Sequence, residues 1–363
     1  MAIKYIEEYR SRELSQTLMA RIHRTSQKPV RLMEVCGTHT VALFRSGIRS
    51  MLPDNISLLS GPGCPVCVTD QGEIDAFIEL ARTRDVIVAT FGDLIRVPGS
   101  RSSLQQERAA GSDVRVVYSA IDALDIARQN PSRPVVFLGV GFETTAPTIA
   151  ATIVTAEKLG LENFSVFAAH KRVPPALEAL LSSQHLRIDG LLLPGHVSVI
   201  IGVHAYRPLI QRHGMPCAVA GFEAVDLLQA LVLLIEQIER GQPRLDNAYP
   251  RAVTDEGNPK AIKVLEEVFM AADARWRGIG VIRDSGLDIR ERYATFDARR
   301  VFGIAAHQVP DPPGCACGEV LTGSKTPPQC RLYKTACTPA EPVGPCMVSS
   351  EGTCAAYYRY GSL

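Results

Sequence analysis

Pro134-Val-Val-Phe-Leu-Gly-Val-Gly-Phe-Glu-Thr-Thr145 is the stretch that decides the fold class. Its apolar run lacks polar alternation, which is typical of a strand covered on both faces, and it passes directly into a glycine-rich loop. Similar Val-, Ile- and Leu-rich runs predict strands at residues 31–35, 56–60, 85–90, 114–118, 134–140, 164–168, 190–193 and 217–220. Helical patterns, such as those at 73–82 and 222–240, lie between them. This alternation predicts an α/β fold with open parallel sheets and helices on both sides.

The predicted strands can form one large sheet or two smaller ones. We favour two similar α/β domains, because Ser132-Arg-Pro134 has the character of a join and each half carries its own glycine-rich loops. The predicted domains are residues 1–131 and 132–241, followed by a C-terminal domain over 242–363. In that last part a linker is expected at 241–259 and a helix at 261–272.

The C-terminal domain is predicted to be loop-rich, because prolines and glycines interleave with cysteines from residue 310 to 345. Such a segment cannot bury enough apolar surface to hold itself together. We therefore expect its cysteines to cross-link it, directly or through a metal.

The composition narrows the class of protein. The chain has 363 residues, 39 basic and 38 acidic, and no basic stripe, which argues against nucleic acid or an anionic membrane surface as a partner. The charged N-terminus and the lack of an apolar run of about 18 residues predict a cytoplasmic protein without a membrane span. Because cytoplasmic thiols stay reduced, the ten cysteines indicate metal or redox chemistry rather than structural disulfides.

Two cysteine motifs follow predicted strands, where ligand sites gather in open parallel sheets. Cys36-Gly-Thr-His39 comes after the strand at 31–35 and opens a helix, so the helix dipole is expected to favour the Cys36 thiolate. Cys36 and His39 together suit iron or zinc, although a buried cysteine beside a hydrogen-bonded histidine is the alternative. Cys64-Pro-Val-Cys67 has the spacing of a dithiol/disulfide pair, or of half a zinc site.

Three further residues stand out less. Glu143 lies in the glycine-rich loop quoted above, where a turn with a helix cap is the simplest reading. His196 is expected to be a hydrogen-bonded core histidine. Cys217, on a predicted strand, is expected to be a core thiol.

Four C-terminal cysteines have 14, 6 and 16 residues between successive members: Cys315, Cys330, Cys337 and Cys354. Iron–sulfur clusters take thiolates from irregular loops, whereas zinc ribbons usually offer C-x-x-C pairs, which this segment lacks. The pattern favours an iron–sulfur cluster and leaves zinc as the alternative. Cys317 and Cys346 are close enough in sequence to compete as ligands.

Taken together, these motifs resemble the HypD family of hydrogenase maturation factors over nearly the whole chain. The resemblance rests on five motifs in the same order: Cys36-Gly-Thr-His39, Gly61-Pro-Gly-Cys64-Pro-Val-Cys67, Gly141-Phe-Glu-Thr-Thr145, Pro194-Gly-His-Val-Ser198 and Gly344-Pro-Cys-Met-Val-Ser-Ser-Glu351-Gly-Thr-Cys354. The family pattern C-x14-C-x6-C-x16-C implies a [4Fe–4S] cluster on Cys315, Cys330, Cys337 and Cys354, with Cys317 and Cys346 left out. It also implies two α/β domains plus a cluster domain.

The resemblance implies a redox-active scaffold that assembles the Fe(CN)2CO group of [NiFe]-hydrogenases. A HypC-like small chaperone would share the iron with Cys36, and a HypE-like protein would donate cyanide. His39 would be an iron ligand or a hydrogen-bond donor to one. Cys64 and Cys67 would pass electrons between the cluster and the iron, with Glu143 and Glu351 as weaker candidates for proton handling.

Two other functions remain open at this point. An iron–sulfur thiol–disulfide oxidoreductase would need Cys64 and Cys67 but not Cys36. A non-catalytic binding module would use the four C-terminal cysteines as a zinc clasp. The scaffold interpretation requires Cys36 to lie near Cys64 and Cys67, and the four C-terminal cysteines to lie close together in space.

Overall fold

The computed structural model describes residues 7–183 and 186–361. One sheet contains β1 (Val30–Glu34), β2 (Ile56–Ser60), β7 (Gly190–Pro194), β8 (Cys217–Ala220) and β9 (Leu245–Asn247), in the order β2-β1-β7-β8-β9. The other contains β3 (Ile87–Thr90), β4 (Asp113–Val116), β5 (Val135–Gly139) and β6 (Phe164–Ala168), in the order β4-β3-β5-β6. Every pairing in both sheets is parallel, which confirms the predicted fold class.

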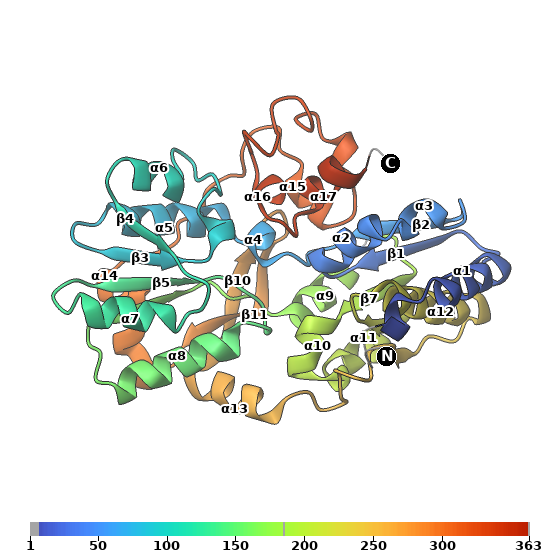
Figure 1. The fold of residues 1–363 in the computed structure, drawn as a ribbon, viewed down its shortest axis with the longest axis horizontal. Coiled ribbons are helices and arrows are strands. Elements are labelled where there is room, and N and C mark those ends of the chain that lie inside the picture. Colours follow the sequence, from blue (N-terminus) through green and yellow to red (C-terminus); the bar gives the residue numbers. More distant parts are fainter. Residues whose placement is uncertain (1–6, 184–185, 362–363) are drawn as a thin grey trace.

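Helices cover the faces of both sheets (Figure 1). The longer ones are α1 (Arg12–Thr25), α5 (Gln71–Arg82), α8 (Ala146–Lys158), α12 (Ala224–Arg240) and α13 (Pro259–Val268). The shorter ones in the two sheet units are η1 (Glu7–Arg10), α2 (Gly37–Arg45), α3 (Ile48–Met51), α4 (Pro65–Val68), η2 (Gly92–Leu94), α6 (Leu104–Ala109), α7 (Asp122–Gln129), α9 (Val173–Leu181), α10 (Gly195–Ile201), η3 (Val203–Tyr206), α11 (Arg207–His213), η4 (Glu291–Phe296) and α14 (Ala298–Phe302). The apolar face of α12 packs on β7 and β8, so this long helix is largely buried.

The distribution of strands does not follow the boundary predicted between residues 131 and 132. The first sheet combines strands from residues 30–60 with strands from 190–247, and the second takes residues 87–168. β1 pairs with β7, which lies far along the chain, through Leu32 and Gly190. The chain therefore enters the first sheet, leaves to build the second, and returns.

An antiparallel hairpin replaces part of a predicted helix. β10 (Phe269–Trp276) pairs with β11 (Gly280–Ile289), so the helix expected at 261–272 ends at Val268. The alanines at 271 and 272 favour a helix locally, but pairing with β11, which itself packs against β6 and α9, overrides this preference. A smaller error concerns β3, which begins at Ile87 and not at 85, because Asp85 adopts a left-handed φ of 63°.

The C-terminal region, described here over residues 303–361, is loop-rich, as predicted, and its helices are short. These are α15 (Cys317–Leu321), η5 (Pro327–Gln329), α16 (Pro345–Val348) and α17 (Thr353–Tyr360). Figure 1 shows this region above both sheets, with α4 at the centre where the three parts meet. α15 and α16 contact α4, and α17 contacts α2, so the C-terminal region lies over the carboxyl ends of β1 and β2.

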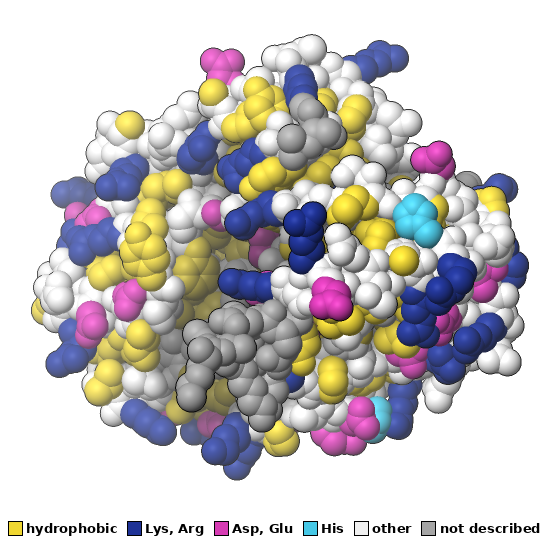
Figure 2. Space-filling model, turned by 45° about the vertical axis from the view of Figure 1, so that its right-hand side comes forward, with side chains coloured by type: hydrophobic (Ala, Val, Ile, Leu, Met, Phe, Trp, Pro, Cys, Tyr) yellow, Lys and Arg dark blue, Asp and Glu magenta, His cyan; other side chains and the backbone are white. Residues whose placement is uncertain are grey.

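On the face shown in Figure 2, basic and acidic side chains are interspersed, with small groups of hydrophobic side chains between them. Across residues 7–183 and 186–361, no helix combines the length and apolar character needed to cross a membrane.

Candidate functional site

Two cysteine loops lie side by side at the carboxyl ends of β1 and β2. These strands are parallel neighbours, so the residues that follow them emerge at one edge of the sheet. The N–H of Gly37 donates to the carbonyl of Gly63 at 3.0 Å. A Cβ built on Gly63 would lie 2.2 Å from the backbone nitrogen of Cys36, so the two loops touch through bare backbone. Cys36 is thus next to the loop that carries Cys64.

We predict that Gly63→Ala destabilises this junction. The new methyl group would meet rigid backbone, so one loop must move away from the other, and the free energy of unfolding should fall by about 1–3 kcal/mol. The control is Gly92→Ala, where the nearest atom to a new Cβ is 3.7 Å away, an ordinary contact. Denaturant unfolding of both variants measures the difference; equal stabilities would contradict the close approach.

The C-x-x-C cysteines form a disulfide within α4. Cys64 is the N-cap residue of this helix, and Pro65 at the first helical position fixes its start. The Cys64 sulfur also accepts a hydrogen bond from the backbone N–H of Cys67 at 3.2 Å. Both cysteines are buried, with 3% and 0% of their surfaces exposed. The pair is therefore shielded from solvent, between the first sheet and the C-terminal region.

Cys36 is less acidic than its position at the start of α2 suggests. It is the N-cap residue of α2 and is almost fully buried. Burial, followed by the nearby Glu351 carboxylate, raises the pKa of Cys36 to about 12, although the N–H groups of His39 and Thr38 act in the opposite direction. The prediction of an easily formed thiolate is thus wrong for the protein alone, because desolvation outweighs the helix dipole. A bound cation would reverse this balance.

His39 has the hydrogen-bonding pattern of a metal ligand. Its ring is fully buried, and Nε2 is 3.2 Å from the carbonyl oxygen of Ala220, to which the neutral tautomer donates. Burial lowers the pKa of His39 to about 4, which keeps the ring neutral. Among the described residues, Nδ1 has no partner. A histidine held by a carbonyl at one nitrogen with the other free is the usual arrangement around a metal.

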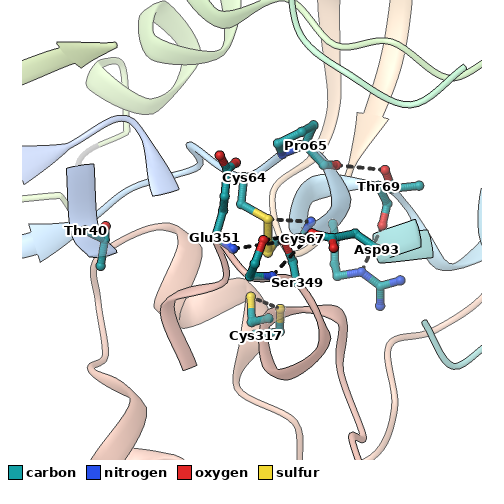
Figure 3. Close-up of a disulfide and its surroundings, with 12 residues drawn as sticks. Thr40, Cys64, Pro65, Cys67, Thr69, Asp93, Cys317, Ser349 and Glu351 are labelled. Carbon is teal, nitrogen blue, oxygen red and sulfur yellow. Dashed lines mark hydrogen bonds between the residues drawn. A yellow bond between two sulfur atoms is a disulfide. The ribbon is translucent and has the colours of Figure 1, made fainter. Parts of the chain in front are cut away.

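Glu351 ties the C-terminal region to the start of α2. The Thr38 hydroxyl donates to its carboxylate at 2.6 Å, and a Cβ on Gly37 would lie 2.3 Å from the Glu351 carbonyl oxygen. Burial raises the pKa of Glu351. Figure 3 shows this residue beside the disulfide. Glu351 is therefore placed to influence both Cys36 and the disulfide.

Ser349 and Ser350 fix the same segment from the other side. The Asp93 carboxylate, on η2, accepts hydrogen bonds from the Ser349 hydroxyl at 3.0 Å and from the Ser350 N–H at 3.3 Å. Arg49 adds a third attachment, since it donates to the Tyr357 hydroxyl on α17 at 3.0 Å and pairs with Glu34. These contacts join the C-terminal region to both sheet units.

Six cysteines line one enclosed cavity in the C-terminal region. They are Cys315, Cys317, Cys330, Cys337, Cys346 and Cys354, with Val320, Leu332, Tyr333 and Met347 among the other lining residues. The predicted convergence of the four C-terminal cysteines is thus present in space. The cavity alone does not separate these four from Cys317 and Cys346.

Cys317 and Cys346 are distinguished by their position. Their sulfurs are 2.9 Å apart, and both cysteines are buried. They lie on α15 and α16, the two short helices that contact α4 and its disulfide. Figure 3 shows Cys317 and its sulfur contact next to the Cys64–Cys67 disulfide. Sequence reasoning treated them only as competing ligands, because nothing in their spacing reveals that they face α4.

The side chains around this cavity include the ligand type that an iron–sulfur cluster takes. Within residues 7–183 and 186–361, no three His, Cys, Asp or Glu side chains are grouped closely enough to hold one metal ion. A [4Fe–4S] cluster instead binds four thiolates, each on a different iron, so its ligands stand further apart around a shared space. Thiols in irregular loops, as here, are the ligands that such a cluster takes.

His196 is not a core residue, contrary to the sequence prediction. It is exposed and stacks on Phe222 with ring centroids 3.8 Å apart, and Phe222 also contacts His39 at 4.9 Å. His196 occupies the first turn of α10 after β7, so its side chain reaches the sheet edge near His39. Cys217, in contrast, is fully buried in β8, as predicted.

Glu143 is a buried carboxyl group that caps α9. Its oxygens accept the backbone N–H of Val173 at 2.9 and 3.2 Å. The sequence predicted a turn with a helix cap, and Glu143 does cap a helix. The capped helix is α9, and not α8, which directly follows the loop. Burial raises the pKa of Glu143 to about 7.

We predict that Glu143 makes the protein less stable as the pH rises towards neutrality. The folded state holds the proton up to about pH 7, whereas the unfolded state releases it near 4.5. The unfolded state is therefore favoured as pH rises between these values, by about 3 kcal/mol in total. Unfolding at about pH 5 and pH 8 should show this loss in the wild type and not in Glu143→Gln. Glu79→Gln, at an exposed position on α5, is the control; the same slope in all three proteins would refute the prediction.

The site combines a buried disulfide, a thiol-lined cavity and a buried Cys–His pair, held between two parallel-sheet units. The chain is therefore an α/β protein with a thiol-rich site where its three parts meet. Comparison with known proteins specifies the family. A family model described as "HypD: Hydrogenase formation hypA family" matches residues 13–361. The chain belongs to the HypD family of hydrogenase maturation factors.

Similar curated proteins cover almost the full chain. The hydrogenase maturation factor HypD of Azotobacter vinelandii is 46% identical over 368 residues, covering 99% of this chain and 97% of the relative. HypD of Rhodobacter capsulatus is 45% identical, with 99% and 98% covered, and HypD of Escherichia coli K12 is 44% identical, with the same shares covered.

Proposed function

We propose that this chain assembles the Fe(CN)2CO group of [NiFe]-hydrogenases as a redox-active scaffold in the cytoplasm. The iron is its cargo, received and passed on with a HypC-like small chaperone, and a HypE-like protein donates cyanide. The proposal is carried by one observation: the Cys64–Cys67 disulfide lies between the Cys36 loop and the thiol-lined cavity.

Cys36 and His39 are the residues we propose to hold the iron. Cys36 would supply a thiolate once the cation offsets its burial, and His39 would supply the Nδ1 lone pair or orient another ligand. These two ligands leave positions open for diatomic groups and for a cysteine of the chaperone. We place the chaperone over the carboxyl ends of β1 and β7, near Cys36, where the exposed His196 ring also lies.

Cys315, Cys330, Cys337 and Cys354 are proposed to hold a [4Fe–4S] cluster, which supplies electrons singly when bound. Cys317 and Cys346 would then form a dithiol between that cluster and α4. Reduction of the Cys64–Cys67 disulfide takes two electrons and two protons. The Cys317/Cys346 dithiol can provide both by becoming a disulfide itself, through thiol–disulfide exchange.

Anaerobic purification with a HypC-like partner tests the proposal. Iron and sulfide analysis should give about four irons per chain for the cluster plus the cargo iron, and infrared spectra should contain bands of bound CO and cyanide. A preparation with the cluster but no diatomic ligands under maturing conditions would refute the scaffold function. If the metal analysis gave zinc in place of iron, it would favour a non-catalytic binding module in which the four C-terminal cysteines hold zinc.

A thiol–disulfide oxidoreductase is the second candidate, supported by the disulfide itself. Its sulfurs are buried, so an external protein disulfide could reach them only after α4 or the C-terminal region moves. This burial favours exchange within the chain over exchange with outside substrates. Turnover of a protein disulfide by Cys36→Ala at the wild-type rate would support the second candidate.

A further inference from the structure

One stretch of irregular chain, residues 330–334, forms both a wall of the thiol-lined cavity and part of the protein surface. Cys330, Leu332 and Tyr333 line the cavity. Arg331 and Lys334 lie between and beside them in the chain, and their side chains are exposed. At this place, therefore, one thickness of chain separates the cavity from solvent.

The cysteines around the cavity differ in exposure. Cys317 and Cys346 are buried, and the helices that carry them contact α4 and its disulfide. Three others are partly exposed: Cys315, Cys330 and Cys354. The proposed exchange with the disulfide uses the buried pair, so electrons that arrive from outside need another way in. The wall formed by residues 330–334 provides one at the surface.

The surface over this wall is basic. Residues 320–340 and 352–361 contain no Asp or Glu, although the whole chain has 38 acidic and 39 basic residues. Lys325 is paired with Glu319 at 2.7 Å. Neither Arg331 nor Arg359 forms an ion pair with another residue of the described parts of the chain, and both are exposed. Their positive charges therefore face solvent without a carboxylate beside them.

Aromatic contacts join these charges into one surface. The Lys334 ammonium lies 5.6 Å from the ring centroid of Tyr333 and 5.6 Å from that of Tyr358. The two rings are 6.3 Å apart, and Tyr358 directly precedes Arg359 on α17. We call this surface the basic face, and it consists of Arg331, Tyr333, Lys334, Tyr358 and Arg359. Tyr and Arg are the residue types that protein interfaces favour.

Lys334 has a backbone conformation that a lysine rarely adopts. Its φ is 59°, in the left-handed region that glycine and asparagine tolerate best. Its N–H donates to the carbonyl of Cys337 at 3.2 Å, which closes the turn between two cavity cysteines. Asparagine would form this turn with less strain, so backbone geometry does not explain the lysine. Its exposed charge does.

We propose that the basic face is the docking surface for an acidic protein of the ferredoxin type, which carries single electrons. The inference rests on the redox function proposed above and names its reductant. One electron leaves the reduced carrier, which is thereby oxidised, and enters the chain at the thiol-lined cavity. Two such encounters, with two protons from solvent, supply what the reduction of one disulfide needs. Opposite charges steer the carrier to the face, and electron-transfer encounters of this kind need only a small interface.

Binding of a purified acidic [2Fe–2S] ferredoxin to the full chain, purified anaerobically, tests the proposal. Calorimetry should give a micromolar dissociation constant at low ionic strength, which rises about tenfold or more when salt is raised to roughly 0.3 M. Arg331→Glu/Arg359→Glu should raise it about tenfold or more at low salt. The second-order rate at which reduced ferredoxin is oxidised, measured by stopped flow, should fall by a similar factor.

Lys334→Asn separates the charge from the turn. Asparagine suits the left-handed conformation, so the fold should be at least as stable as the wild type in denaturant unfolding. Loss of the charge should nevertheless weaken ferredoxin binding about threefold. Lys334→Asn with wild-type affinity would show that this lysine takes no part in docking.

Lys158→Glu/Lys260→Glu is the matched control for the double variant. It makes the same change in net charge at exposed positions on α8 and α13, which Figure 1 shows at the bottom of the view, away from the C-terminal region at the top. It should bind the ferredoxin like the wild type.

Undetectable or salt-independent binding, or equal affinities of the two double variants, would overturn the docking surface. With iron and sulfide complete, that result would leave the proposed function intact, whereas zinc in place of iron would refute both. Because Arg331 follows Cys330 directly, iron and sulfide are measured in every variant. If the double variant loses them, Arg359→Glu alone and Lys334→Asn decide the matter.

Discussion

Cys36→Ala should abolish the infrared bands of CO and cyanide in the anaerobically purified complex with the chaperone. Cys36 is the single thiol at the start of α2, and its position next to the Cys64 loop makes it the only described cysteine outside the disulfide at that sheet edge. Without its sulfur, His39 alone cannot retain the iron. Cluster iron should remain at about four per chain, because Cys36 does not line the thiol-rich cavity.

Cys217→Ala is the matched control for this experiment. Cys217 is also a buried thiol, on β8 of the same sheet, but its chemistry is not used in the proposed site. It should mature hydrogenase normally apart from a small loss of stability. Full maturation by Cys36→Ala would remove the central assignment, whereas loss of maturation in both variants would show a folding effect.

Much of the fold could be predicted because the local signals were strong. Apolar runs without alternation marked every strand of the two main sheets except β9, and the end of each run placed the cysteine loops at strand ends. The assignment of strands to sheets could not be predicted in the same way. The pairing of Leu32 with Gly190 joins distant parts of the chain, and no local pattern encodes it.

The site was predicted less completely, for a physical reason. Residue types and spacing identify cysteines that can bind a metal, but the reactivity of a cysteine also depends on its burial. Burial raises the pKa of Cys36, although its position at the start of a helix favours the thiolate. The facing pair Cys317 and Cys346 depends on how two short helices pack on α4.

Cys315→Ala and Cys317→Ala should differ sharply although the residues are only two positions apart. Both line the same cavity, but the proposed cluster uses Cys315 and leaves Cys317 to face Cys346. Cys315→Ala should lose most of the cluster iron and sulfide. The loop-rich region should then also lose its ordered structure, because that region has few regular elements to stabilise it.

Cys317→Ala should keep the cluster and fail in electron transfer. Its iron and sulfide should match the wild type, since four cavity cysteines remain besides Cys346. After anaerobic reduction, however, thiol titration should find Cys64 and Cys67 still joined, because the neighbouring dithiol that would reduce them is incomplete. Limited proteolysis separates the two outcomes independently, with cleavage in the C-terminal region of Cys315→Ala alone. If Cys317→Ala lost the iron and Cys315→Ala kept it, the ligand set implied by the family pattern would be wrong and the relay would have to run through Cys315.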